Sequence, residues 1–261
     1  MIKAFVARLK QGHRTIRYPA APPPAMPDRF RGRLLIDAAA CPKDCRSCVD
    51  ACPTGAIAPA STPAGGAGPL VLDLGRCLFC TDCARACPQG ALSFSDDYRL
   101  AVRRREDLVV SDPERALELA EALGGRLRRV LGRSLKLRQV SAGGCNACEA
   151  DVNVLGTIGW DLGRFGIQMV ASPRHADGLL VTGPVTKNMD LALRKTYDAV
   201  PEPKIIIAVG ACAISGGPYL DHEEAGNGVS AILPVDLFVP GCPPHPLSIL
   251  DGLLRLIGTV R

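Results

Sequence analysis

Cysteine is the residue type whose number and spacing point to chemistry in this chain of 261 residues. Ten of the 12 cysteines stand in three dense clusters, while Cys212 and Cys242 each stand alone after an apolar run. The first residues lack the long apolar run of a secretory signal, so we expect a protein that stays in the cytoplasm. Because thiols seldom form structural disulfides there, the cysteines favour metal ligation.

The first two clusters are copies of one motif. The second copy reads Cys-x2-Cys-x2-Cys-x3-Cys-Pro, the spacing with which bacterial ferredoxins bind [4Fe–4S] clusters. The first copy has one additional residue after Cys41, which is either a loop adjustment or a sign of a more labile cluster. In this motif the fourth cysteine serves the other cluster. One cluster would therefore use Cys41, Cys45, Cys48 and Cys87, and the other Cys77, Cys80, Cys83 and Cys52.

A pair of zinc sites is the alternative, since four thiolates also suit Zn²⁺. Zinc does not explain the internal duplication or the paired Cys-Pro endings, so the motif favours iron–sulfur clusters. The segment thus resembles a two-cluster ferredoxin.

The remaining four cysteines share one position relative to the expected strands. Cys145 and Cys148 stand where a strand over 135–140 meets a helix, and Cys212 and Cys242 follow apolar runs over 204–210 and 236–241. Open parallel sheets place ligands beyond the carboxyl ends of their strands, so the four thiols should converge on a third metal centre. A lone cysteine is more often a small buried hydrophobe, and Cys-x2-Cys can be a redox motif, but neither alternative accounts for all four.

The elements that must position these cysteines predict an α/β protein with two folded parts. We expect an N-terminal arm over 1–33, a ferredoxin-like two-cluster domain over 34–98, a basic linker with a helix over 99–134, and a parallel-sheet domain over 135–261. Residues 58–69 read as a loop inserted between the two motif copies. Asp112 as N-cap and Pro113 as first residue predict that the linker helix runs on to Leu131, weakened at Gly124–Gly125.

Composition narrows the possible partners. The basic excess lies between Arg99 and Arg138 without interleaved aromatic residues, which disfavours nucleic-acid binding. No apolar run approaches the roughly 18 residues of a membrane span.

No complete acid–base or nucleophilic site is apparent in the sequence. Glu149 could relay protons or simply stabilise a helix start, and His245 is the histidine best placed to approach a cluster.

Three long stretches carry a resemblance to a known family: "ASPRHADGLLVTGPVT", "PEPKIIIAVGACAISGG" and "PVDLFVPGCPPHP". They resemble the small-subunit family shared by respiratory complex I, as its 20 kDa subunit, and membrane-bound group 4 [NiFe] hydrogenases. The resemblance covers about Leu135 to Arg261 and implies a flavodoxin-like domain with one [4Fe–4S] cluster beside a large subunit. The first half and "KQGHRTIRYP" resemble the separate ferredoxin-like subunit of the same complexes, here fused into one chain.

One departure separates the branches of that family. The complex I subunit begins its cluster motif with two adjacent cysteines, whereas Cys145-x2-Cys148 followed by Glu149 is similar to the hydrogenase small subunits, including formate hydrogenlyase-type assemblies. By resemblance, Arg164 and Arg174 lie in stretches that face the large subunit or a quinone-like cavity.

The resemblance implies an electron-transfer subunit with three [4Fe–4S] clusters, about twelve irons, peripheral on the cytoplasmic side of the membrane. Its partners would be a large subunit and further subunits of a membrane-bound complex. A fused subunit of an NADH- or ferredoxin-quinone oxidoreductase and a free-standing ferredoxin-type carrier are the alternatives.

Overall fold

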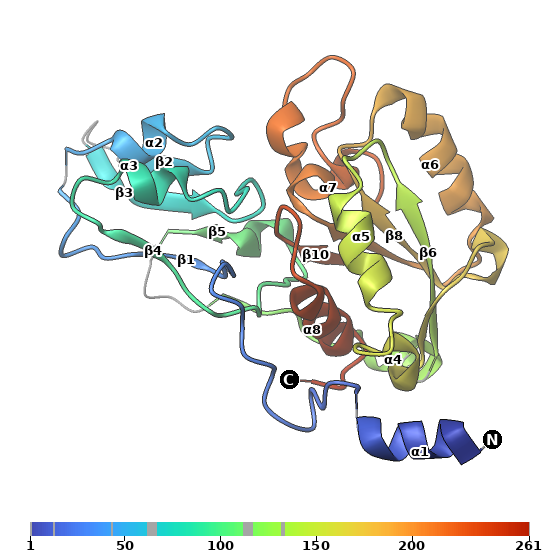
Figure 1. Cartoon of the computed structure of the whole chain (residues 1–261). Helices are drawn as coiled ribbons and strands as arrows, with labels where there is room; N and C mark the ends of the chain where they lie inside the picture. The colour runs from blue at the N-terminus through green and yellow to red at the C-terminus, as the bar shows by residue number, and fades with distance from the viewer. Residues whose placement is uncertain are drawn as a thin grey trace.

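The computed structural model describes residues 2–12, 14–42, 44–61, 67–111, 117–131 and 134–260. Figure 1 shows two folded parts: small antiparallel sheets with the cysteine-rich segment on one side, and a larger sheet with helices on the other. The predicted α/β class is confirmed.

The cysteine-rich part is built from two small antiparallel sheets and two short helices. One sheet pairs β1 with β4, and the other has the order β2-β3-β5. Buried Ile57 pairs with buried Leu72, so apolar burial fixes the register of β2 on β3. The elements are β1 (Leu34–Ile36), α2 (Ser47–Asp50), β2 (Ile57–Ser61), β3 (Ala67–Asp73), α3 (Asp82–Ala86), β4 (Leu92–Phe94) and β5 (Val109–Val110).

The expectation of a loop over 58–69 is therefore wrong at both ends, where β2 and β3 pair; residues 62–66 lie outside the described residues. Antiparallel pairing of the two segments with each other outweighs the weak strand propensity of proline, glycine and alanine.

The larger part is a parallel sheet in the order β10-β9-β8-β6-β7. This is the strand order of the flavodoxin-like fold. Every residue of β8 and β9 is buried, as expected for strands covered on both faces. The strands are β6 (Leu135–Ser141), β7 (Ile167–Met169), β8 (Gly178–Thr182), β9 (Ile205–Val209) and β10 (Leu237–Val239), and the helices are α5 (Ala147–Val154), α6 (Lys187–Ala199), α7 (Ala211–Ser215) and α8 (Pro246–Leu256).

The two parts share one hydrophobic core. Leu74 and Leu108 from the antiparallel part pack in the same buried cluster as Ile214 and Phe238 from the parallel part. Val102 also exchanges two backbone hydrogen bonds with Phe238, of 3.0 and 2.9 Å, at the edge of the parallel sheet. The cysteine groups are consequently held in a fixed relation by packed structure.

The linker helix is shorter than expected. It forms only as α4 (Gly125–Leu131), and residues 117–124 are irregular. The backbone N–H of Ala120 bonds Ala101 O at 2.8 Å, and that of Leu123 bonds Leu256 O at 2.9 Å, so these donors serve the body of the protein in place of a helix. The predicted helix start at Asp112 and Pro113 lies outside the described residues.

The N-terminal arm begins with a helix that was not anticipated, α1 (Ile2–Gln11). The chain after it crosses the parallel part, where Ile16 N donates to Gly159 O at 2.9 Å. Tyr18 is buried there, and its hydroxyl donates to Asp251 Oδ1 on α8 at 2.6 Å.

Candidate metal centres

The two ferredoxin-type motifs fold alike around their last cysteines. The N–H of Ala56 donates to Cys52 Sγ at 3.2 Å, and the N–H of Ala91 donates to Cys87 Sγ at 3.3 Å. The glycine three residues after each cysteine has a φ of 60° and 63° respectively, which an L-residue rarely adopts. The Cys-Pro-x-Gly-Ala repeat therefore builds the same sulfur-directed turn twice.

The first group of thiols surrounds Cys48 on α2. Burial raises the pKa of Cys48, and the neighbouring Cys41, Cys45 and Cys87 raise it further. Cys41 likewise has a raised pKa, from burial and then from Cys45 and Cys87. The four residues predicted as the first ligand set thus lie near one another, with Cys87 contributed by the other motif copy.

The second group surrounds Cys77. Burial, together with Cys83, Cys52 and Cys80, raises the pKa of Cys77 to about 12. The N–H of Phe79 donates to Cys77 Sγ at 3.3 Å and acts in the opposite direction, because it stabilises the thiolate. Cys52 accordingly lies with the second group, as the exchange of fourth cysteines predicts.

The third group lies at the carboxyl ends of β6, β9 and β10. Burial raises the pKa of Cys148, and Cys212, Cys242, Glu149 and Cys145 raise it further. Burial also raises the pKa of Cys212 to about 11, with Cys242 and Cys145 contributing. The structure brings together the four cysteines that the strand ends predicted.

A left-handed residue opens the Cys-x2-Cys turn in the second and third groups. Thr81 follows Cys80 with a φ of 74°, and Asn146 follows Cys145 with a φ of 69°; each precedes a helix that carries the next cysteine. Arg46, at the corresponding place in the first motif, has a φ of −125°. The first motif, with its additional residue, therefore turns differently.

Two glycines leave space for the sulfurs of the third group. A Cβ added to Gly210 would lie 2.5 Å from Cys148 Sγ, and one added to Gly217 would lie 2.8 Å from Cys212 Sγ. Both glycines also have a positive φ, of 93° and 56°. Larger residues at either position would displace the neighbouring sulfur.

The three groups lie in series. Cys48 of the first group is close enough to raise the pKa of Cys83 in the second, after burial, Cys80 and Cys52. Cys80 of the second group in turn raises the pKa of Cys242 in the third, after burial and Cys145. The second group therefore adjoins both the first and the third.

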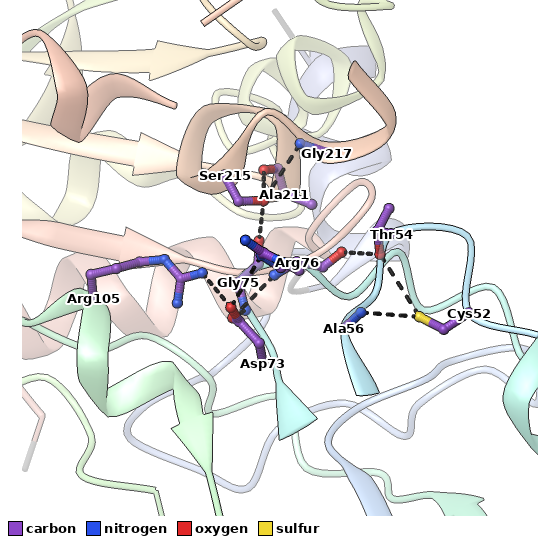
Figure 2. A network of polar contacts seen from close by, with 10 residues as sticks. All are labelled: Cys52, Thr54, Ala56, Asp73, Gly75, Arg76, Arg105, Ala211, Ser215 and Gly217. Carbon is purple, nitrogen blue, oxygen red and sulfur yellow. Dashed lines mark hydrogen bonds and ion pairs between the residues drawn. The ribbon is translucent and has the colours of Figure 1, made fainter. Parts of the chain in front are cut away.

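A chain of hydrogen bonds joins the second and third groups (Figure 2). Thr54 Oγ1 lies 3.9 Å from Cys52 Sγ and donates to Arg76 O at 2.8 Å, in the loop before Cys77. Buried Ser215, on α7, donates to the carbonyl oxygen of Gly75 in the same loop, with an O···O distance of 3.0 Å.

Asp73 fixes the shape of this loop. Its carboxylate accepts from Gly75 N at 2.9 Å and Arg76 N at 3.3 Å, and Arg105 Nη2 donates to its other oxygen at 2.6 Å. Because Ser215 lies on the helix that carries Cys212, the network ties that helix to the loop bearing Cys77. No local sequence signal identifies Asp73, Arg105 or Ser215 in this role.

All twelve cysteines are free thiols. Among the described residues, no three His, Cys, Asp or Glu side chains gather as a site for a single metal ion. Four thiols form the donor set that a [4Fe–4S] cluster uses, and in the first two groups backbone amides are also directed at sulfur. The residues present fit that group at each of the three places.

Two family models match separate parts of the chain. Residues 145–256 match the family described as NADH ubiquinone oxidoreductase, 20 Kd subunit, and residues 38–91 match the 4Fe-4S dicluster domain. A probable membrane-bound hydrogenase subunit, mbhJ, of Pyrococcus furiosus is 43% identical over 129 residues, which are 49% of this chain and 77% of that protein. This chain belongs to the 20 kDa subunit family.

Three further likenesses accompany these matches. An uncharacterized protein of Methanocaldococcus jannaschii is 43% identical over 124 residues, 48% of this chain and 83% of that protein. A chain of the membrane-bound sulfane sulfur reductase, an archaeal respiratory membrane complex, is 33% identical with a TM-score of 0.45 and covers 52% of this chain and 75% of that chain. A chain of an NAD+-reducing [NiFe]-hydrogenase is 23% identical with a TM-score of 0.39 and covers 49% of this chain and 94% of that chain.

The predicted family relationship is confirmed, as is the presence of iron–sulfur chemistry in the dicluster segment.

This 20 kDa family member carries its third cysteine group at the surface. Cys145 and Cys242 are exposed, whereas Cys148 and Cys212 are partly buried. A cavity of about 280 Å³ opens beside Cys242, and Phe79 of the second group's loop also lines it.

Glu149 does not point to the surface. It is 5% exposed, and its Oε1 accepts from Ser141 Oγ at 2.6 Å and from Thr182 Oγ1 at 2.7 Å. The carboxylate thereby joins the first turn of α5 to β6 and β8.

His245 caps α8, and its Nδ1 accepts from Leu247 N at 3.1 Å. The rings of Phe30 and Trp160 approach its imidazole edge-on, with centroids 5.3 and 6.0 Å away, and burial lowers the pKa of His245.

Arg164, placed by resemblance near a partner or cavity, donates to the carbonyl oxygens of Ile16 and Tyr18 and so holds the N-terminal arm against the parallel-sheet part.

Proposed function

We propose that this 20 kDa family member is the electron-transfer subunit of a membrane-associated, multisubunit complex of the group 4 [NiFe]-hydrogenase type. It conducts electrons along three [4Fe–4S] clusters to or from the catalytic site of a large subunit. The observation that carries the proposal is that the second cysteine group adjoins the third, since Phe79 in the loop between Cys77 and Cys80 lines the same cavity as Cys242.

Each cluster would be held by four thiolates and would supply reversible one-electron transfer when bound. The proposed ligand sets are Cys41, Cys45, Cys48 and Cys87; Cys77, Cys80, Cys83 and Cys52; and Cys145, Cys148, Cys212 and Cys242.

The chain's own residues set the conditions for that transfer. The N–H groups of Ala56, Phe79 and Ala91 donate to cysteine sulfurs, and such bonds raise the reduction potential of a cluster. The shared core and the Ser215–Gly75 hydrogen bond hold the second and third groups at a constant separation. Exposure of Cys145 and Cys242 supports this face as the one turned to a large subunit.

No described helix is long and apolar enough to cross a bilayer. We propose that the chain associates peripherally, on the cytoplasmic side, through the other subunits of its complex. The membrane-bound hydrogenase relative supports the association with a membrane complex.

Anaerobic isolation of the native protein tests the proposal. We expect co-purification with a large subunit and membrane subunits, and reduction of the chain's clusters by hydrogen in that preparation. Isolation as a monomer that exchanges electrons with soluble carriers alone would mean a free-standing ferredoxin-type carrier and would contradict the proposal.

A quinone oxidoreductase is the second candidate, because the matching family is described by the 20 kDa subunit of NADH ubiquinone oxidoreductase. The same preparation distinguishes the two functions. Hydrogen evolution or uptake identifies the hydrogenase, and quinone-dependent turnover without hydrogen chemistry identifies the quinone oxidoreductase.

A further inference from the structure

Helix α1 exposes apolar side chains that no other part of the described structure covers. None of its ten residues is buried, although it carries Ile2, Phe5, Val6 and Leu9, which are 81%, 67%, 41% and 67% exposed. These are four of the ten large apolar residues that are exposed among the described residues. In Figure 1 the helix stands clear of both folded parts, at the end of the molecule that also carries α4.

The four apolar residues form one stripe. Their spacing of three, four and seven residues places them on a single face of a helix. At 3.6 residues per turn, Lys3 and Lys10 project about 80–100° to one side of Ile2, and Arg8 about 120° to the other. Cations therefore flank the stripe on both sides, and small or polar residues fill the opposite face.

The charge around the helix has one sign. Arg14 and Arg17 follow it, and no acidic residue occurs before Asp28. An apolar stripe bordered by lysine and arginine is the pattern of helices that lie in the plane of a membrane surface, where the cations meet anionic headgroups. The helix is about 15 Å long, too short to span the roughly 30 Å hydrocarbon core.

The segment after α1 is tied to the body of the protein. Thr15 Oγ1 donates to Ile158 O at 2.9 Å, and Arg164 donates to Ile16 O at 2.6 Å. Ile158 is itself 72% exposed, so a further apolar side chain lies where the arm joins the body.

We propose that α1 is a surface anchor that inserts its apolar stripe into the headgroup region of an anionic lipid bilayer. The chain thereby contacts the membrane itself, in addition to any contact through partner subunits. The helix and its attachment contain no cysteine, so the anchor operates whether or not the clusters are those proposed above.

Vesicle co-sedimentation of the purified full chain tests this anchor. We expect binding to vesicles of phosphatidylcholine with phosphatidylglycerol and much weaker binding to phosphatidylcholine alone. A Phe5→Ser/Leu9→Ser variant should bind the anionic vesicles at least tenfold more weakly. Removing two cations as Lys3→Gln/Lys10→Gln should weaken binding by roughly 25-fold, about fivefold for each cation.

Leu191→Ser on α6 is the matched control, because Leu191 is 62% exposed and lies on another element. Its binding should equal that of the unaltered chain. The anchor is refuted if the unaltered chain ignores anionic vesicles, or if the α1 variants bind them normally. It is also refuted if the α1 variants fail to join partner subunits in detergent, since the stripe would then occupy a protein groove. Iron content, measured on the same samples, reports on the proposed clusters separately.

Discussion

Replacing Gly210 by alanine should remove the third cluster and leave the other two. The new Cβ would lie 2.5 Å from Cys148 Sγ, about 1–1.5 Å inside the roughly 3.5–4.0 Å at which nonbonded atoms settle. A free cysteine can rotate away, but a cysteine bound to a cluster cannot. The φ of 93° and ψ of 155° at Gly210 are also nearly exclusive to glycine, which adds strain of about 1–3 kcal/mol to the fold.

Iron analysis and electron paramagnetic resonance of the reduced protein measure the effect. We expect iron to fall by about four atoms per chain, with one cluster signal lost and two retained. Gly12→Ala is the control, because Gly12 also has a positive φ, of 63°, but no atom lies within 4 Å of its added Cβ. Full iron in the Gly210→Ala protein would refute the view that Cys148 is held by a cluster beside this glycine.

Three further substitutions test other parts of the account. Cys212→Ser should remove one cluster signal and leave two, and loss of all three signals would mean that the domain division is wrong. Ser215→Ala should lower the free energy of unfolding by about 1–2 kcal/mol with iron unchanged, because buried Gly75 O loses its donor; an unchanged unfolding midpoint in denaturant would contradict this. Tyr18→Phe should cost about 1.5–3 kcal/mol in the same assay at pH 7, since Asp251 loses a hydrogen bond. Burial and then the bond to Asp251 raise the pKa of Tyr18, so the native protein should lose stability above about pH 10, where the unfolded tyrosine ionises, and this loss should be smaller in the Phe variant.

The sequence allowed the cysteine groups to be predicted because their signals are local. Cysteine spacing placed Cys52 with the second group, and apolar runs placed Cys212 and Cys242 at strand ends. The helical spacing of Ile2, Phe5 and Leu9 is equally local, but it spans less than three turns and is a weak signal by itself.

Other features depend on contacts between distant residues and leave no local pattern. Residues 117–124 have helical spacing, yet the N–H groups of Ala120 and Leu123 bond to Ala101 and Leu256. The hydrogen bond between Ser215 and Gly75, like the pairing of Val102 with Phe238, exists only because the two parts pack together. Periodicity reports which face of an element is apolar, and it carries no information on such partners.

The central claim is that this chain carries three [4Fe–4S] clusters in series. The most direct measurement is iron, acid-labile sulfide and zinc per chain in anaerobically purified protein, combined with electron paramagnetic resonance during a reductive titration. We expect about twelve irons, about as many sulfides, and magnetic coupling of one cluster to each of two others. About eight irons, or zinc in place of iron at the third group, would contradict the claim.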